Sequence, residues 1–176
     1  MAVGTPTVLL VASLLAQAPA NPALQRSVDE LRGCIGRWDV TTDFLKEDGT
    51  VAKSATGIYE FSWIVADRVV SGRNDMPELK QAAGILFYID EHRGVIEMVS
   101  VGNDGHLWTM TGPLGGDQRT SQEFESAVGG TTRLRFTRSN VATDSFESRM
   151  DYTEDGGKTW KPANHQRFRR AAPAKN

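Results

Sequence analysis

The sequence contains a single cysteine, Cys34, among its 176 residues, so an intramolecular disulfide is excluded. Histidine is also scarce, with three residues that are far apart in the chain. The zinc patterns H-E-x-x-H and C-x-x-C do not occur, nor do G-x-S-x-G, the P-loop or a dinucleotide-binding fingerprint. We therefore expect no resident metal or cofactor, and the sequence favours binding over catalysis.

The chain also lacks an excess of charge of one sign. It has 20 Lys and Arg against 22 Asp and Glu, which gives a net charge of −2. This balance creates no positive field that would attract nucleic acid or an anionic membrane surface. The apolar run at residues 8–15 is too short to cross a bilayer as a helix, so we expect no transmembrane segment.

Residues 1–20 have the features of a signal peptide, a short apolar run followed by small residues. Cleavage near Ala20 is expected, because a cut after Ala18 would leave Pro19 directly behind it. A signal peptide predicts a secreted or periplasmic protein. The first seven residues carry no Lys or Arg, so a different true start or a disordered apolar tail remain as alternatives.

The remaining chain is predicted to form one domain at residues 21–170, followed by a disordered tail at 171–176. Residues 22–32 predict a short helix, because three apolar residues recur there at i, i+4 and i+7. Pro22 near the start and Gly33 after the last turn support these limits.

From Trp38 onward, apolar and polar residues alternate with period two, which predicts strands with one buried face. Turn signals such as Asp48-Gly49 and Asn103-Asp104-Gly105 separate these stretches. About ten strands result, joined by short hairpins apart from a polar loop at residues 73–82. This pattern predicts an all-β, antiparallel, up-and-down barrel with a short N-terminal helix, because closure removes exposed strand edges.

The predicted inner faces are rich in aromatic side chains. These side chains either fill the core or, in a barrel of this many strands, surround a pocket for a small hydrophobic molecule. The residues expected to line such a cavity are Phe44, Tyr59, Phe61, Trp63, Phe87, Trp108, Phe124, Phe136, Phe146, Met150 and Tyr152.

A Gly36-x-Trp38 tripeptide stands between the predicted helix and the first strand. Glycine permits a tight turn there, and Trp38 is expected to close one end of the barrel. An arginine from the last strand would lie across the indole ring, and Arg167 and Arg169 are the candidates.

With this tripeptide the chain resembles the lipocalin-like (calycin) barrels, whose first strand begins with G-x-W. It is similar to a bacterial family of small exported lipocalin-like domains of unknown function. The shared features are an L-x-G-x-W-like start ending at Trp38, a strand at residues 84–90, and a closing D-G-G-x-x-W at residues 155–160. The resemblance covers about residues 31–170 and implies a barrel with a cavity, but no reaction.

Two histidines support alternative functions. In haem-binding barrels of the nitrobindin-like group a late-strand histidine binds iron, so His165 is a candidate, although strand alternation points it outward. A calycin-type enzyme acting on a small lipophilic substrate would use His106 with a rim carboxylate such as Asp104 or Glu97. Residues 153–160 also match the Asp-box pattern, which we interpret as a structural turn.

The leading hypothesis is an exported barrel that binds an apolar or amphipathic small molecule. A structural or interaction protein of the cell envelope with a filled core is the remaining alternative. The sequence determines neither the ligand nor the oligomeric state.

Overall fold

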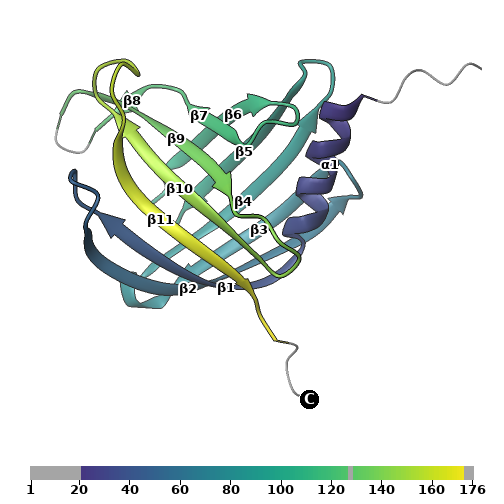
Figure 1. The fold of residues 1–176 in the computed structure, drawn as a ribbon, viewed down its shortest axis with the longest axis horizontal. Coiled ribbons are helices and arrows are strands. Elements are labelled where there is room, and N and C mark those ends of the chain that lie inside the picture. Colours follow the sequence, from purple (N-terminus) through teal and green to yellow (C-terminus); the bar gives the residue numbers. More distant parts are fainter. Residues whose placement is uncertain (1–20, 127–128, 173–176) are drawn as a thin grey trace, which may run out of the picture.

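The computed structural model describes residues 21–126 and 129–172 (Figure 1). In this part of the chain one α-helix, α1 (Pro22–Cys34), precedes ten strands that close into an antiparallel barrel. The predicted signal peptide lies outside the described residues, as do residues 173–176 of the predicted tail. The ten strands are β1 (Gly36–Leu45), β2 (Val51–Val65), β3 (Val69–Met76), β4 (Gln81–Asp90), β5 (Val95–Gly102), β6 (Leu107–Pro113), β7 (Gln118–Ser121), β9 (Thr131–Ser139), β10 (Ser145–Thr153) and β11 (Lys161–Arg170).

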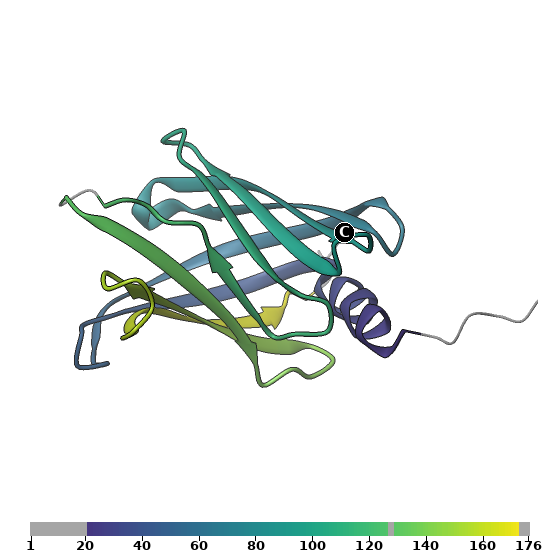
Figure 2. The same cartoon turned by 90° about the horizontal axis from the view of Figure 1, so that it is seen from above.

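The strands follow one another around the barrel, and this confirms the predicted up-and-down connectivity. Each strand of the ring pairs with its neighbour in sequence, and β1 pairs with β11 to close the ring. The two-residue β8 (Phe124–Glu125) pairs only with β9 and lies outside the ring. Figure 2 shows the barrel from above, with its strands inclined to the long axis.

The helix α1 covers one end of the barrel, on the right in Figure 1. The side chain of Asn21 accepts hydrogen bonds from the first backbone amides of α1 and so caps it. Arg32 forms an ion pair with Asp67 in the β2–β3 turn, with a 2.6 Å separation between nitrogen and oxygen. The Ser27 hydroxyl accepts a 2.8 Å hydrogen bond from the Gly115 amide in the β6–β7 loop. The opposite end carries the β1–β2, β5–β6 and β10–β11 turns and the short 3-10 turn between β3 and β4.

The chain passes from α1 into β1 through Gly36, which has φ +117°. This is a conformation that residues with a Cβ rarely adopt. A Cβ at this position would also lie 2.8 Å from Nη1 of Arg170. The predicted role of Gly36 in a tight turn is therefore confirmed.

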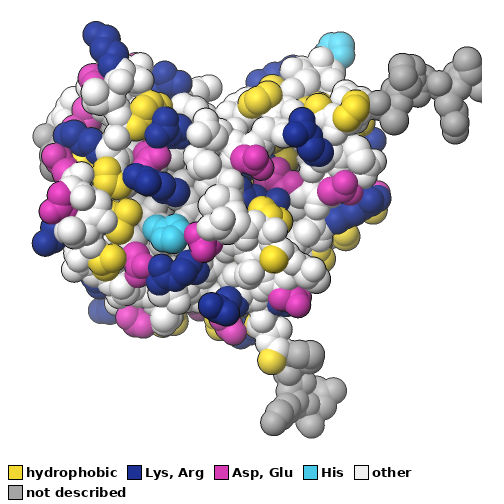
Figure 3. All heavy atoms as spheres, in the orientation of Figure 1, with side chains coloured by type: hydrophobic (Ala, Val, Ile, Leu, Met, Phe, Trp, Pro, Cys, Tyr) yellow, Lys and Arg dark blue, Asp and Glu magenta, His cyan; other side chains and the backbone are white. Residues whose placement is uncertain are grey.

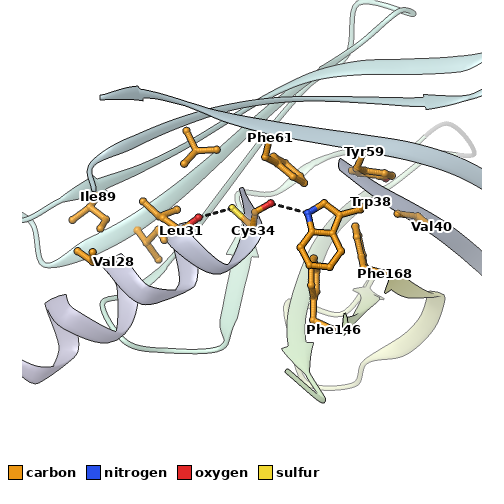
Figure 4. Packing of buried hydrophobic residues seen from close by; sticks show 12 residues of the cluster. Val28, Leu31, Cys34, Trp38, Val40, Tyr59, Phe61, Ile89, Phe146 and Phe168 are labelled. Atoms are coloured by element: carbon orange, nitrogen blue, oxygen red, sulfur yellow. Dashed lines mark hydrogen bonds between the residues drawn. The ribbon is translucent and has the colours of Figure 1, made fainter. Parts of the chain in front are cut away.

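A cluster of buried hydrophobic side chains lies between α1 and the barrel wall (Figure 4). Trp38 is 1% exposed, and its indole Nε1 donates a 2.7 Å hydrogen bond to the carbonyl oxygen of Cys34. The Trp38 ring meets Phe146 edge-on at 5.0 Å, and Phe146 stacks on Phe168 at 4.1 Å between ring centroids. Burial of these rings joins α1 to the ends of β1, β10 and β11.

The prediction of a polar loop at residues 73–82 is wrong for most of this segment. β3 continues to Met76 and β4 begins at Gln81, so only a single 3-10 turn, Pro77–Leu79, separates them. The polar residues are accommodated on both faces of β3. Arg73 forms an ion pair with Glu60 on the outside, whereas Asn74 donates a 3.0 Å hydrogen bond to the Tyr59 hydroxyl. Cross-strand pairing thus stabilises a strand whose composition suggests a loop.

The Asp-box sequence forms the β10–β11 turn, and this confirms its interpretation as structural. Asp155 accepts hydrogen bonds from the Thr159 amide, the Thr159 hydroxyl and the Thr153 hydroxyl. These bonds, with those from Thr159 the strongest, hold the pKa of the Asp155 carboxyl well below its usual range. Gly156 and Gly157 both have positive φ in the same turn.

The surface of the barrel carries mixed side chains. On the face in Figure 3, side chains of both charge signs alternate, and hydrophobic side chains are scattered between them. In the described part of the chain, no helix combines the length and the apolar character that spanning a bilayer requires.

Candidate functional site

The interior of the barrel contains a cavity of about 360 Å³. It extends from α1 to the opposite rim, where the lining residue Gln81 is exposed at the start of β4. Protein interiors rarely contain voids larger than a few water molecules, so a space of this size is a distinct structural feature. The apolar lining residues are Leu31, Cys34, Tyr59, Phe61, Ile85, Phe87, Met98, Trp108, Met110, Leu134, Phe136, Phe146, Met150, Ala163 and Phe168.

Of the eleven residues predicted to line a cavity, the structure brings seven to its wall. They come from five different strands, and strand alternation alone places them on the same side. The seven are Tyr59, Phe61, Phe87, Trp108, Phe136, Phe146 and Met150.

The other four predicted lining residues lie near the two ends of the barrel. Trp63 packs against the core at the α1 end. Phe124 lies behind Trp108, edge-on at 4.7 Å between ring centroids. Tyr152 lies at the opposite rim, where Lys161 sits over its ring. Phe44 is in the same phase as Trp38, near the end of β1, but does not reach the cavity.

The cation over Trp38 belongs to Arg170, whereas Arg167 and Arg169 were the candidates. The Arg170 guanidinium carbon lies 4.3 Å from the indole centroid, and Arg170 is the direct cross-strand partner of Trp38. Arg167 points to the outer wall, where it forms a 2.6 Å ion pair with Asp43, and Arg169 is exposed. The physical reason is the two-residue period, which puts residues 168 and 170 inside and their odd-numbered neighbours outside.

A cluster of uncharged polar groups interrupts the apolar wall. Gln166 donates hydrogen bonds to the hydroxyls of Thr42 at 3.0 Å and Tyr59 at 3.1 Å, and it accepts one from Ser148 at 3.3 Å. The Tyr59 hydroxyl also accepts the bond from Asn74. Apart from Asn74 Oδ1, which is buried without a partner among the described residues, these groups satisfy one another.

Three charged residues at the α1 end of the cavity were missed by sequence reasoning. Glu30 and Arg138 line the cavity, and Arg119 lies directly behind the lining rings of Phe87 and Phe136. The alternation that points Phe136 inward also points Arg138 inward, so the signal was present. It was overlooked because arginine is usually an outward-facing residue.

Cys34 lines the cavity and is 8% exposed. Burial, reinforced by the nearby charge of Glu30, raises the pKa of its thiol to about 12. Since only the thiolate reacts, we expect alkylation of Cys34 in the native protein to be on the order of 10³-fold slower than in the unfolded chain at neutral pH. Iodoacetamide labelling followed by mass spectrometry, with and without urea, measures both rates. Similar rates would contradict the burial of this thiol.

His165 does not reach the cavity. Its Nε2 lies 2.9 Å from a Glu147 carboxylate oxygen on the outer wall, beside Arg167. Hydrogen bonds from Asn140 and His165 lower the pKa of that carboxyl. An iron ligand for a haem in the barrel would have to point inward, so this geometry gives no support to the haem alternative.

The enzymatic alternative requires His106 and a carboxylate inside the barrel mouth, and neither His106 nor Asp104 lines the cavity. The His106 side chain is 72% exposed, and its Nδ1 lies 3.1 Å from the carboxylate of Asp104, which is in the same turn and 62% exposed. Glu97 lies on the outer face of β5, where it accepts hydrogen bonds from Tyr88 and Arg93. Among the described residues, no three His, Cys, Asp or Glu side chains are grouped so that they would hold a metal ion.

No family model matches the chain, and the search of curated proteins finds no similar sequence. The closed ten-stranded barrel is compatible with a calycin-like fold.

Proposed function

We propose that this chain is an exported, lipocalin-like barrel that binds an apolar or amphipathic small molecule in its interior. The observation that carries the proposal is the cavity of about 360 Å³ with its mainly aromatic and aliphatic wall. Binding pockets for small molecules typically measure about 300–1,000 Å³ and combine apolar walls with a few polar groups. Export is proposed from the sequence of residues 1–20 alone.

The energetics of the empty space favour an occupant. Each unfilled part of an apolar interior loses dispersion contacts that the surrounding side chains would otherwise make. A bound molecule restores these contacts and removes its own apolar surface from water. A barrel that served only as a rigid scaffold would gain stability by filling this volume with larger side chains.

The proposal is tested by filling the cavity with a side chain. Ser100 lines the cavity on β5, opposite Trp108 of β6, so Ser100→Trp places an indole in the space for the ligand. The matched control is Val101→Trp, because Val101 is the next residue of the same strand and is 43% exposed on the outside.

We expect the wild-type protein to bind Nile red or a long-chain alcohol saturably, with fluorescence or calorimetry as the readout. Ser100→Trp should weaken this binding by about tenfold or more, equivalent to at least about 1.4 kcal/mol, whereas Val101→Trp should leave it unchanged. Absence of saturable binding, or equal binding by all three proteins, would refute a ligand site in the barrel.

A further inference from the structure

The charged residues at the α1 end of the cavity do not balance. Arg119 has a side chain with 0% exposure, and its Nη2 lies 2.7 Å from both carboxylate oxygens of Glu30. Glu30 is thereby neutralised. Arg138, the other cation of this region, has no ion pair and no side-chain hydrogen bond among the described residues. Of the described charged residues that line the cavity, Glu30 is paired and Arg138 is not; Arg138 also borders an outer hollow together with Asp29 and Asp117.

The free guanidinium is held in place by the cavity wall. The guanidinium carbon of Arg138 lies 4.9 Å from the ring centroid of Phe146, and both residues line the cavity. Arg138 is opposite Ser148 in the β9–β10 register, and Ser148 is buried on the inner face of the barrel. The guanidinium of Arg138 thus lies between the Phe146 ring and α1, where its Nη2 would be 3.5 Å from a Cβ built at Gly33.

The neighbouring cation is also incompletely paired. Nε and Nη1 of Arg119 are buried without a hydrogen-bond partner among the described residues. Buried donors that lack acceptors are costly, and the cost is larger for a charged group. An anion at this end of the cavity would provide acceptors for the guanidinium of Arg138, whereas a cation would be repelled by it.

The remainder of the cavity is uncharged, since its polar groups are the hydroxyls and amides clustered around Tyr59 and Gln166. An anionic group therefore has one favourable position, and an apolar tail has the space between the aromatic walls and the rim at Gln81. We propose that the ligand is an amphipathic anion whose head group binds Arg138 and whose tail lies along Phe61, Trp108 and Met110. This inference rests on the proposed function and specifies the chemical class of the ligand.

The planar guanidinium fork forms two parallel hydrogen bonds with a carboxylate or a phosphate, and these bonds are about twice as strong as neutral ones. The experiment therefore compares four probes with one tail, namely dodecanoate, dodecyl phosphate, dodecanol and methyl dodecanoate. Binding is measured by calorimetry to the wild type, Arg138→Gln, Arg138→Lys and a control, Arg73→Gln. Arg73 is 71% exposed on the outer wall of β3.

We expect the wild type to bind at least one of the anionic probes about tenfold or more tightly than the two neutral probes. Arg138→Gln should abolish this preference, because the anionic probes lose their guanidinium partner while the neutral probes carry no charge to pair with it. Arg138→Lys should retain part of it, because lysine keeps the charge without the fork. Arg73→Gln should behave like the wild type. A stronger preference for dodecanoate identifies a carboxylic acid, and the reverse identifies a phosphate monoester.

Two failures can be told apart. If all four probes bind equally, or if the anion preference survives Arg138→Gln in a protein whose circular dichroism matches the wild type, the charge-based inference is overturned and the cavity proposal stands. If no probe binds to any of the proteins, the proposed function itself fails.

Discussion

Replacing Glu30 with glutamine is expected to lower the free energy of unfolding by about 3–5 kcal/mol, because the charge of Arg119 is then buried without a counter-charge. The side chain of Arg119 is fully enclosed and that of Glu30 is 16% exposed, so water cannot replace the lost carboxylate. Urea unfolding monitored by circular dichroism, with unchanged slope against denaturant, measures this loss.

The double variant Glu30→Gln, Arg119→Met tests whether the unpaired charge of Arg119 causes the loss of stability in Glu30→Gln. Methionine fills much of the space of the arginine without a charge, so the double variant should recover most of the stability lost by Glu30→Gln. The control is Glu91→Gln. Glu91 pairs with Arg68 at 2.7 Å, but the two side chains are 46% and 42% exposed, and the expected loss is below about 1 kcal/mol. Equal losses for Glu30→Gln and Glu91→Gln would contradict the isolation of the inner pair from water.

Trp38→Ala is expected to cost about 3–5 kcal/mol of stability, the usual range for deleting a large buried aromatic side chain. The loss combines the packing against Phe146, the cation–π contact with Arg170, and the hydrogen bond to the Cys34 carbonyl that joins α1 to β1. Thermal or urea unfolding of the purified variant measures the change.

Two further variants show which part of Trp38 matters. Trp38→Phe keeps most of the apolar volume but leaves the Cys34 carbonyl without its donor, so we expect an intermediate loss of about 1–3 kcal/mol. Trp108→Ala serves as the matched control, because Trp108 is half-buried and borders the cavity. Its loss should be clearly smaller. If Trp108→Ala destabilised the protein as much as Trp38→Ala, Trp38 would have no special role in closing the barrel.

The barrel could be predicted because strand alternation is a local property. In β9, Leu134 and Phe136 face the cavity, whereas Arg135 on the opposite face pairs with Asp151 at 2.9 Å. The same period placed Tyr59 and Phe61 inside. The boundaries of β3 and β4 could not be predicted, since the polar residues of this segment are stabilised by partners such as Glu60 that are distant in sequence.

The charged end of the cavity was missed by sequence reasoning for a related reason. The side chain of Arg138 points inward, as the alternation of its strand predicts. It was not expected there because arginine side chains usually face the solvent. Arg119 and Glu30 are 89 positions apart, and only the position of α1 across the barrel end brings them together.

The sequence by itself determined which side chains of each strand share a face, where the turns lie, and that a helix precedes the strands, because these depend on backbone periods and on glycine, proline and aspartate at turns. Only the tertiary structure decided where strands such as β3 and β4 begin and end, how much space the ring leaves, and which cation meets which aromatic side chain. Those outcomes depend on distances between strands far apart in the chain, and such distances are set by the packing of the whole barrel around α1.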